Sequence, residues 1–248
     1  MTVRHDNVTA EWLGYATLRL ETGDTVVYFD PGRYGVLTGE WEPHEPGVRH
    51  PEPRDYEARD GDIVCVTHVH HYDPDGIRRV AKPDATVVAF DGINVHESDR
   101  DLERFADLEF EVREVSMEDE ILVGDTPVWT VPAYNREDGT NLRPDGTPIH
   151  PKGFGCGFLV SLDGTRVFWP GDSDVLDGHA ELDVSLFVPS LAPNDTMDRH
   201  EAADLAEAMD PDLVLPMHYN TFESLAADDE AFAADVASRH IPVVLDRD

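Results

Sequence analysis

Residues 66–76 read Val66-Thr67-His68-Val69-His70-His71-Tyr72-Asp73-Pro74-Asp75-Gly76. This segment follows the apolar run Asp62-Ile63-Val64-Cys65, which is typical of a buried strand. Alternating residues of an extended chain point the same way, so His68 and His70 can converge on one point. Neutral imidazole is the commonest metal ligand among side chains. The segment therefore indicates a metal site at the carboxyl end of a strand, in preference to a polar turn that happens to be rich in histidine.

Three further residues with metal-binding side chains follow along the chain. Asp172 and His218 each come after a short apolar, strand-like run, whereas His150 lies in a loop bounded by Pro and Gly. Taken singly, such residues are more often turn or structural residues, but the spaced set is far more specific. Together with His68 and His70, the set predicts a metal-centred hydrolytic site.

Short motifs follow one another in the order of a known family. They are Trp12-Leu13-Gly14-Tyr15-Ala16-Thr17, Val27-Tyr28-Phe29-Asp30-Pro31, Pro132-Ala133-Tyr134-Asn135, His150-Pro151-Lys152-Gly153, Pro170-Gly171-Asp172-Ser173-Asp174, Thr196-Met197 and Pro216-Met217-His218-Tyr219. In this order they resemble the metallo-β-lactamase superfamily, in its lactonase-like, metal-dependent hydrolase branch, over roughly four-fifths of the chain. The resemblance implies an α/β (α+β) fold, a four-layer αββα sandwich. It also implies a single domain over residues 1–248, with pseudo-repeated halves of about 1–122 and 123–248.

The resemblance also implies the ligands of the first metal. His68, His70 and His150 complete that position, with Asp172 able to bridge to a second metal, and His218 follows as a further ligand. Zn is the expected metal, as one or two ions, although a mixed set of histidine and carboxylate ligands also suits Mn or Fe.

The second metal position departs from the family signature His-x-His-x-Asp-His. An ungapped comparison puts Tyr72 and Asp73 where Asp and His are expected. A comparison that matches His71-Tyr72-Asp73-Pro74 to the trailing His-aromatic-x-Pro of the family needs a two-residue deletion, which removes the Asp. Either way at least one usual ligand is missing, and both His71 and Asp73 are candidates to replace it. The opening motif also has Tyr15 where many relatives have His.

The mechanism implied is hydrolysis of a small ester, lactone or phosphodiester by a metal-bound hydroxide. Asp73 is the candidate proton shuttle, and Tyr219 is a candidate donor to a developing oxyanion. Two alternatives stay open: a degenerate relative that binds one metal as a sensor or scaffold, and a nucleic-acid phosphodiesterase.

The charge of the chain is unusual: 19 Lys and Arg stand against 52 Asp and Glu, a formal net charge of −33. Self-repulsion on this scale destabilises a compact state in dilute buffer. At about 1 M salt the Debye length falls to roughly 3 Å, so the repulsion largely disappears. The composition predicts a salt-rich cytoplasm, as in a halophilic archaeon. It argues against nucleic acid as a partner, because nucleic-acid binding needs basic stripes, and leaves a small-molecule substrate as the expected partner.

Localisation is expected to be cytoplasmic, with no membrane partner. No stretch is long and apolar enough to span a bilayer, and the N-terminus lacks the features of a signal peptide. Cys65 and Cys156 lie in apolar runs and are interpreted as reduced thiols. The sequence indicates no particular oligomeric state.

Local patterns predict many strands and few helices. The predicted strands are Val8–Leu13, Thr17–Glu21, Thr25–Phe29, Ile63–Val66, Thr86–Phe90, Phe110–Val115, Pro127–Val131, Gly157–Leu162, Arg166–Trp169, Leu186–Pro189, Leu213–Leu215 and Pro242–Leu245. The predicted helices are Pro74–Ala81, Asp198–Met209 and Asp228–Arg239. Two long loops, Gly32–Asp60 and Asn135–Gly155, are expected to shape the pocket, with His44 and His50 of the first loop solvated.

Overall fold

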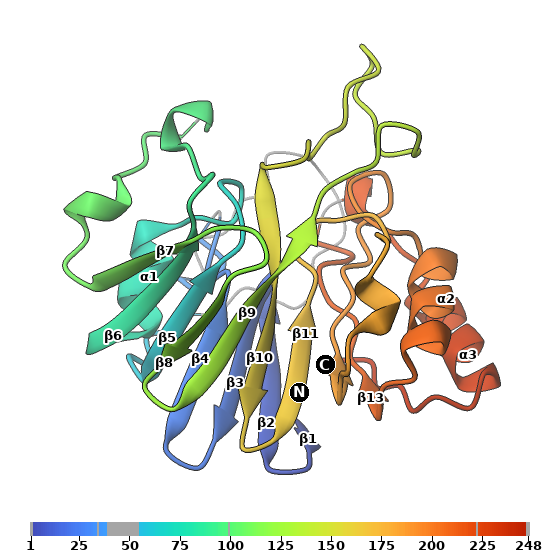
Figure 1. The fold of residues 1–248 in the computed structure, drawn as a ribbon, viewed down its shortest axis with the longest axis horizontal. Coiled ribbons are helices and arrows are strands. Elements are labelled where there is room, and N and C mark those ends of the chain that lie inside the picture. Colours follow the sequence, from blue (N-terminus) through green and yellow to red (C-terminus); the bar gives the residue numbers. More distant parts are fainter. Residues whose placement is uncertain (1, 34, 39–54, 99, 222, 247–248) are drawn as a thin grey trace.

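The computed structural model describes residues 2–33, 35–38, 55–98, 100–221 and 223–246, and two β-sheets form its centre (Figure 1). The first sheet has seven strands in the order β1-β2-β3-β4-β5-β6-β7. They are β1 (Thr2–His5), β2 (Val8–Gly14), β3 (Thr17–Thr22), β4 (Thr25–Phe29), β5 (Gly61–Val66), β6 (Ala81–Phe90) and β7 (Glu111–Val115). Strands β1 to β4 pair antiparallel, and β4 to β7 pair parallel.

The second sheet has six strands in the order β13-β12-β11-β10-β9-β8. They are β8 (Glu120–Val123), β9 (Thr126–Ala133), β10 (Gly155–Leu162), β11 (Thr165–Trp169), β12 (Leu186–Phe187) and β13 (Leu213–Val214). Strands β8 to β11 pair antiparallel, and β11 to β13 pair parallel. The chain passes from one sheet to the other between β7 and β8. Both sheets thus contain an antiparallel part followed by a parallel part, as a repeated unit would, although the pseudo-repeat itself stays a prediction.

Helices complete the layers on either side of the sheets (Figure 1). They are α1 (Pro74–Val80), α2 (Arg199–Met209) and α3 (Asp229–Ser238), with short 3-10 helices η1 (Val95–Glu97), η2 (Phe105–Asp107), η3 (His179–Glu181) and η4 (Glu223–Leu225). Ile77 and Val80 of α1 pack with Val64 of β5 in one apolar cluster. The larger cluster joins both sheets to α2 and α3, and it includes Trp12 and Trp169. This arrangement confirms the predicted αββα sandwich.

Helix boundaries follow the local signals in the sequence. Asp198 accepts hydrogen bonds from the backbone of His200 and Glu201, while the Glu201 carboxylate accepts from the Asp198 N–H. This reciprocal capping box satisfies N–H groups that the first turn of α2 leaves unpaired. The helix ends at Asp210, which has a left-handed backbone with φ of 52° and precedes Pro211.

The structure differs from the predicted elements at three short segments. The predicted strand Pro242–Leu245 is wrong, because pairing there is limited to a single bridge between Val243 and Val214, and Pro242 has no N–H to extend it. Strands β1 and β8 were not predicted, since they are only four residues long and carry charged side chains. Among the described residues, no helix has the length and apolar character that crossing a membrane would need.

Candidate metal centre

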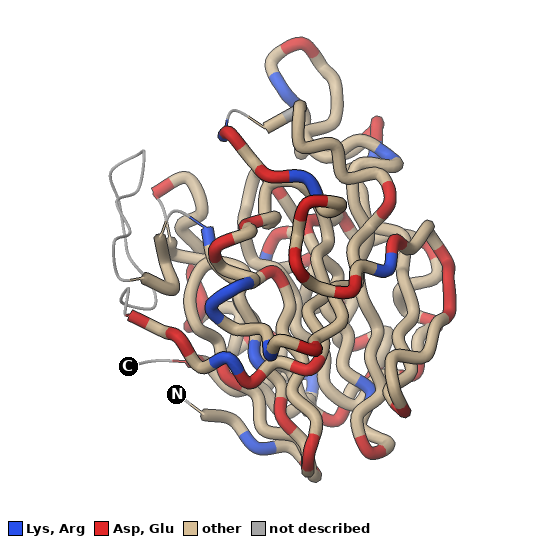
Figure 2. The backbone as a smooth tube through the Cα atoms, turned by 90° about the vertical axis from the view of Figure 1, so that its left-hand side faces the viewer, with Lys and Arg blue, Asp and Glu red and all other residues tan. Residues whose placement is uncertain are grey.

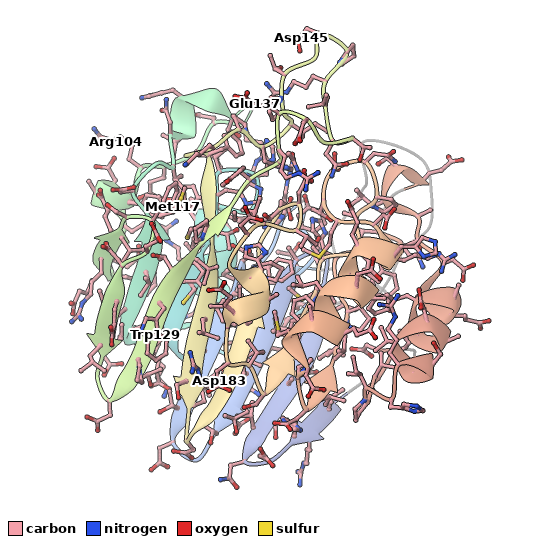
Figure 3. All side chains as sticks on the ribbon, turned by 45° about the vertical axis from the view of Figure 1, so that its right-hand side comes forward. Arg104, Met117, Trp129, Glu137, Asp145 and Asp183 are labelled. Atoms are coloured by element: carbon pink, nitrogen blue, oxygen red, sulfur yellow. The ribbon has the colours of Figure 1, made fainter. Side chains whose placement is uncertain are left out.

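The predicted ligands come from segments that follow strands in both sheets. His68 lies just beyond β5 in the first sheet, whereas Asp172 and His218 lie beyond β11 and β13 in the second. His150 lies at the base of the loop between β9 and β10, which rises above the end of the sheets (Figure 1). Asp145 marks the tip of this loop (Figure 3). The two sheets therefore bring together residues that are up to 150 positions apart.

Close backbone packing makes this meeting possible. His68 forms an isolated bridge with Gly155, and a Cβ atom at position 155 would lie 2.8 Å from the Cβ of His68. Gly171 has φ of 64°, and a Cβ atom there would lie 2.9 Å from the Cys156 carbonyl oxygen. Only glycine fits these two positions without displacing the neighbouring backbone.

The Asp172 carboxylate lies at the centre of the cluster. Its Oδ2 is 3.5 Å from His68 Nε2 and 3.6 Å from both His71 Nε2 and His150 Nε2. Its Oδ1 is 3.4 Å from His218 Nε2. All five side chains are buried. Such a set of imidazole nitrogens around one carboxylate is the kind of donor set that a divalent cation requires.

Two overlapping groups of ligand atoms can be distinguished. His68, His70 and His150 form one, and His68, His71 and Asp172 form the other, with the ligand atoms of each group within 4.8 Å of one another. In the first group, His70 Nδ1 lies 3.3 Å from His150 Nε2.

The spacing fits a metal ion. Two ligand atoms bound tetrahedrally to one zinc ion with bonds of 2.0–2.1 Å lie about 3.4 Å apart. The observed separations of 3.3–3.6 Å are close to that value. Among the described residues, the buried Nε2 atoms of His68 and His71 have no hydrogen-bond partner. The donor set therefore fits a divalent metal.

Hydrogen bonds on the far side of the rings fix the histidine tautomers. The Thr67 hydroxyl donates to Asp30 Oδ2 at 2.9 Å, so it accepts from His68 Nδ1, also at 2.9 Å. His71 Nδ1 donates to Asp30 Oδ2 at 3.0 Å. Each Nε2 consequently keeps its lone pair toward the cluster, the pattern usual for histidines that bind metal.

Asp30 was not predicted as a site residue, yet it holds this side of the centre together. Its carboxylate is 1% exposed and accepts from the Thr67 N–H, the Thr67 hydroxyl, His71 and the Trp169 indole N–H. Burial alone would raise the pKa of Asp30, but the charges of His71 and His68 and the hydrogen bonds together lower it. The one signal in the sequence was its position in the Asp30-Pro31 pair that ends an apolar strand.

The protonation states of the candidate ligands favour metal binding at neutral pH. Burial lowers the pKa of His68 and of His70, and it lowers that of His150 to about 4. Burial would raise the pKa of Asp172, but His71 and His218 outweigh this effect and hold the pKa well below its ordinary value. At neutral pH, His68, His70 and His150 are therefore neutral and the Asp172 carboxylate is ionised, as metal ligands must be.

Stability of the metal-free protein is expected to fall as the pH drops below about 6.5. The pKa of each of these three histidines is lower in the folded than in the unfolded chain. The unfolded chain then binds more protons in that window, and each histidine contributes up to about 1.4 kcal/mol per pH unit. The lowered pKa of Asp172 affects stability in a lower pH range, because the stabilisation from its ionised carboxylate is lost only below about pH 3.9. Thermal unfolding of chelator-treated protein between about pH 8 and pH 5 tests this. A flat profile would contradict it.

Three residues around the centre have left-handed backbones although none is glycine. Tyr15, Asp30 and His218 have φ of 50°, 47° and 59°. Such conformations are strained for residues with a Cβ, and they persist only where surrounding contacts impose them. The Tyr15 ring packs edge-on against His71 and His218, with centroids 5.3 Å and 4.6 Å apart.

The two predicted catalytic residues lie outside the two ligand groups. Asp73 caps α1, where its Oδ1 accepts from the N–H groups of Asp75 and Gly76 at 3.1 Å, and burial raises its pKa. Tyr219 is fully buried, with its ring 4.9 Å from that of Trp12. Their roles as proton shuttle and oxyanion donor stay predictions. In the predicted loop Gly32–Asp60, His44 and His50 lie outside the described residues.

A two-sheet sandwich with a histidine and aspartate cluster at the end of its strands defines a class of metalloproteins. The sequence matches the model of the family described as "Beta-lactamase superfamily domain" over residues 9–218. The chain belongs to this superfamily, which confirms the resemblance seen in its motifs.

Relatives extend over nearly the whole chain. A UPF0173 metal-dependent hydrolase of Archaeoglobus fulgidus is 30% identical, and the alignment covers 94% of this chain and 92% of the relative. One from Thermococcus kodakarensis is 27% identical, with 96% of each chain covered.

Solved structures show the same fold at lower identity. A metallo hydrolase of Ignicoccus hospitalis superposes with a TM-score of 0.66 at 19% identity, covering 97% of this chain and 95% of the other. An isothiocyanate hydrolase from Delia radicum gut bacteria superposes with a TM-score of 0.68 at 14% identity, covering 96% of each chain.

Proposed function

We propose that this metal-dependent hydrolase of the β-lactamase superfamily cleaves a small ester, lactone or phosphodiester with the help of one or two zinc ions. The observation that carries the proposal is the convergence of four histidine Nε2 atoms on the Asp172 carboxylate, at 3.4–3.6 Å. Mn or Fe would also suit this donor set.

The candidate ligands would form two positions, with Asp172 available to both. His68, His70 and His150 would hold the first metal, and His71 and His218 the second. When bound, a divalent metal supplies hydroxide by lowering the pKa of water to about 7, and it polarises the oxygen under attack. The side chains contribute orientation, because their outer hydrogen bonds fix each ring before a substrate arrives.

Arg33 is placed to stabilise negative charge that develops on the substrate. Its Nη1 donates to the Tyr15 hydroxyl at 2.8 Å, and its charge helps to lower the pKa of His70, of which burial is the main cause. Burial raises the pKa of Tyr15 to about 12, so the phenol stays neutral while it orients the guanidinium. A fixed cation beside a buried centre is a common way to stabilise a transition state of this kind.

One observation favours a second candidate function. Among the described residues, the second position has only His71, His218 and the shared Asp172 as ligands. If this set holds no ion, the protein would be a mononuclear binder with a sensing or scaffold role. The metal count therefore separates the two candidates.

The test is metal content by mass spectrometry, on protein purified in multimolar KCl. We expect two metals per chain, one in His71→Ala and two in Asp73→Ala, because Asp73 caps α1 and His71 faces Asp172. One metal in the unmodified chain, lost in His68→Ala, would support the mononuclear candidate. No metal would overturn the proposal.

Activity assays complete the test. The unmodified protein and the His68→Ala variant are each assayed for hydrolysis of p-nitrophenyl acetate, a simple lactone and bis-p-nitrophenyl phosphate. The variant should be inactive. Turnover of none of the three by the metal-loaded protein would reject the proposed substrate classes.

We also propose a cytoplasmic location at high salt. The buried free thiols of Cys65 and Cys156 and the net charge of −33 support it.

A further inference from the structure

Asn135 contacts His150 through both its backbone and its side chain. Its backbone N–H donates to the His150 carbonyl at 2.8 Å, and its Oδ1 accepts from the His150 N–H at 2.8 Å. The same Oδ1 lies 3.2 Å from His150 Nδ1. Because an amide oxygen can only accept, His150 must carry its proton on Nδ1, which leaves the Nε2 lone pair facing Asp172.

The hydrogen bonds of the Asn135 NH₂ group fix the orientation of the side-chain amide. Its Nδ2 donates to Asp174 Oδ1 and to the Asp195 carbonyl, both at 2.9 Å. A reversed amide would direct its oxygen at these two acceptors and its NH₂ at the His150 N–H, so the side-chain hydrogen bonds to Asp174, to the Asp195 carbonyl and from the His150 N–H would all be lost. Asn135 and Asp174 are 1% and 5% exposed, so water offers little compensation.

Asp174 is itself held in place by the loop that carries His150. Its Oδ1 also accepts from Asn141 Nδ2, and its Oδ2 accepts from the Arg136 N–H at 2.8 Å. Asn141 therefore anchors the loop to the same carboxylate, but it makes no hydrogen bond to His150 in the described part of the chain. This difference offers a matched control.

We propose that Asn135, oriented by the Asp174 carboxylate, is a positioning residue of the metal centre that keeps His150 in the Nδ1–H tautomer. The inference rests on the proposed metal site, in which His150 Nε2 is the ligand atom. Without the Asn135 acceptor, the Nδ1–H of His150 would keep only the Asp195 carbonyl as a partner among the described residues, so the preference for this tautomer would weaken. In the other tautomer Nε2 carries the proton and has no lone pair for a metal. Loss of a partner of this kind commonly lowers metal affinity by about 10- to 100-fold.

The experiment compares Asn135→Leu, Asn135→Ala and Asn141→Leu. Long-range ¹H–¹⁵N spectra of the metal-free protein at neutral pH report the tautomer of His150 directly, and competition with a chromophoric chelator gives the zinc affinity. In Asn135→Leu we expect loss of the Nδ1–H tautomer and an affinity lower by about 10- to 100-fold. Asn135→Ala removes the same acceptor with a smaller side chain and should show the same loss. Asn141→Leu should keep both the tautomer and the affinity.

The outcomes separate a positioning role from a structural one. If Asn135→Leu keeps the tautomer and the affinity, the proposal is overturned. The same holds if Asn141→Leu loses both to the same extent, since the effect would then come from loosening the loop. If Asn135→Leu does not fold, Asn135→Ala decides, because an unchanged Nδ1–H signal and zinc affinity there also overturn the proposal. The tautomer is read without metal or substrate, so failure of the proposed hydrolase activity would leave this result standing.

Discussion

Asp172→Asn is expected to remove metal from both positions and to lower kcat/KM by at least about 1000-fold, which corresponds to about 4 kcal/mol of transition-state stabilisation. The loss is large because both oxygens are used: Oδ2 faces His68, His71 and His150, and Oδ1 faces His218. An amide would place an NH₂ group where one of these oxygens meets the centre. The measurements are the metal content and the kcat/KM for whichever ester, lactone or phosphodiester the unmodified protein hydrolyses fastest.

A matched control separates this effect from a general change of charge. Asp183→Asn removes a carboxylate whose side chain is 88% exposed and whose partner is Arg166, at 3.0 Å. Asp183 lies well away from the projecting loop (Figure 3), so this variant should keep its metal and activity. Two bound metals in Asp172→Asn would show that the carboxylate does not bridge, and would disprove the arrangement.

Unfolding temperature should rise by about 10 °C or more between about 0.1 M and 2 M KCl, a gain of several kcal/mol for a chain of this size. The 52 acidic residues exceed the 19 basic ones by 33, and acidic positions are scattered along the described part of the backbone (Figure 2). A single basic side chain can already serve two carboxylates: the Arg78 guanidinium contacts Glu103 at 2.8 Å and Glu109 at 2.9 Å. Most carboxylates therefore repel one another without local compensation, and dissolved cations must screen them.

The control for salt is a neutral osmolyte such as sucrose at matched water activity, which strengthens burial without screening charge. Screening predicts that most of the gain comes below about 1 M, where the Debye length has already fallen to roughly 3 Å. Equal unfolding midpoints at low and high salt, measured by calorimetry, would rule out repulsion as a controlling factor.

The predicted ligands were accessible from sequence because His68, Asp172 and His218 each follow an apolar run that forms a strand. Strand periodicity and order then place them at one end of the sandwich. The sequence did not show which of His71 and Asp73 lies against Asp172; in the folded chain His71 does, and Asp73 caps α1, as the Asp-Pro helix start already suggested.

Asp30 and Asn135 illustrate what the sequence did not yield. Both act on histidines far along the chain, 41 and 15 residues away. No local period predicts such a contact, because it arises only when the strands have paired and the loop has folded back. Strands β1 and β8 were missed for a different reason: they are short edge strands, whose exposed positions carry polar residues and hide the apolar alternation.

The division of the ligands between the sheets has a consequence for biosynthesis. His68, His70 and His71 follow a strand of the first sheet, whereas His150, Asp172 and His218 belong to the segment that forms the second. A nascent chain that has only its N-terminal half outside the ribosome lacks the shared carboxylate, so it cannot assemble the centre. Assembly of the centre therefore requires both halves of the chain, and the hydrogen bond from the Trp169 indole of the second sheet to Asp30 of the first forms only when the two halves have met.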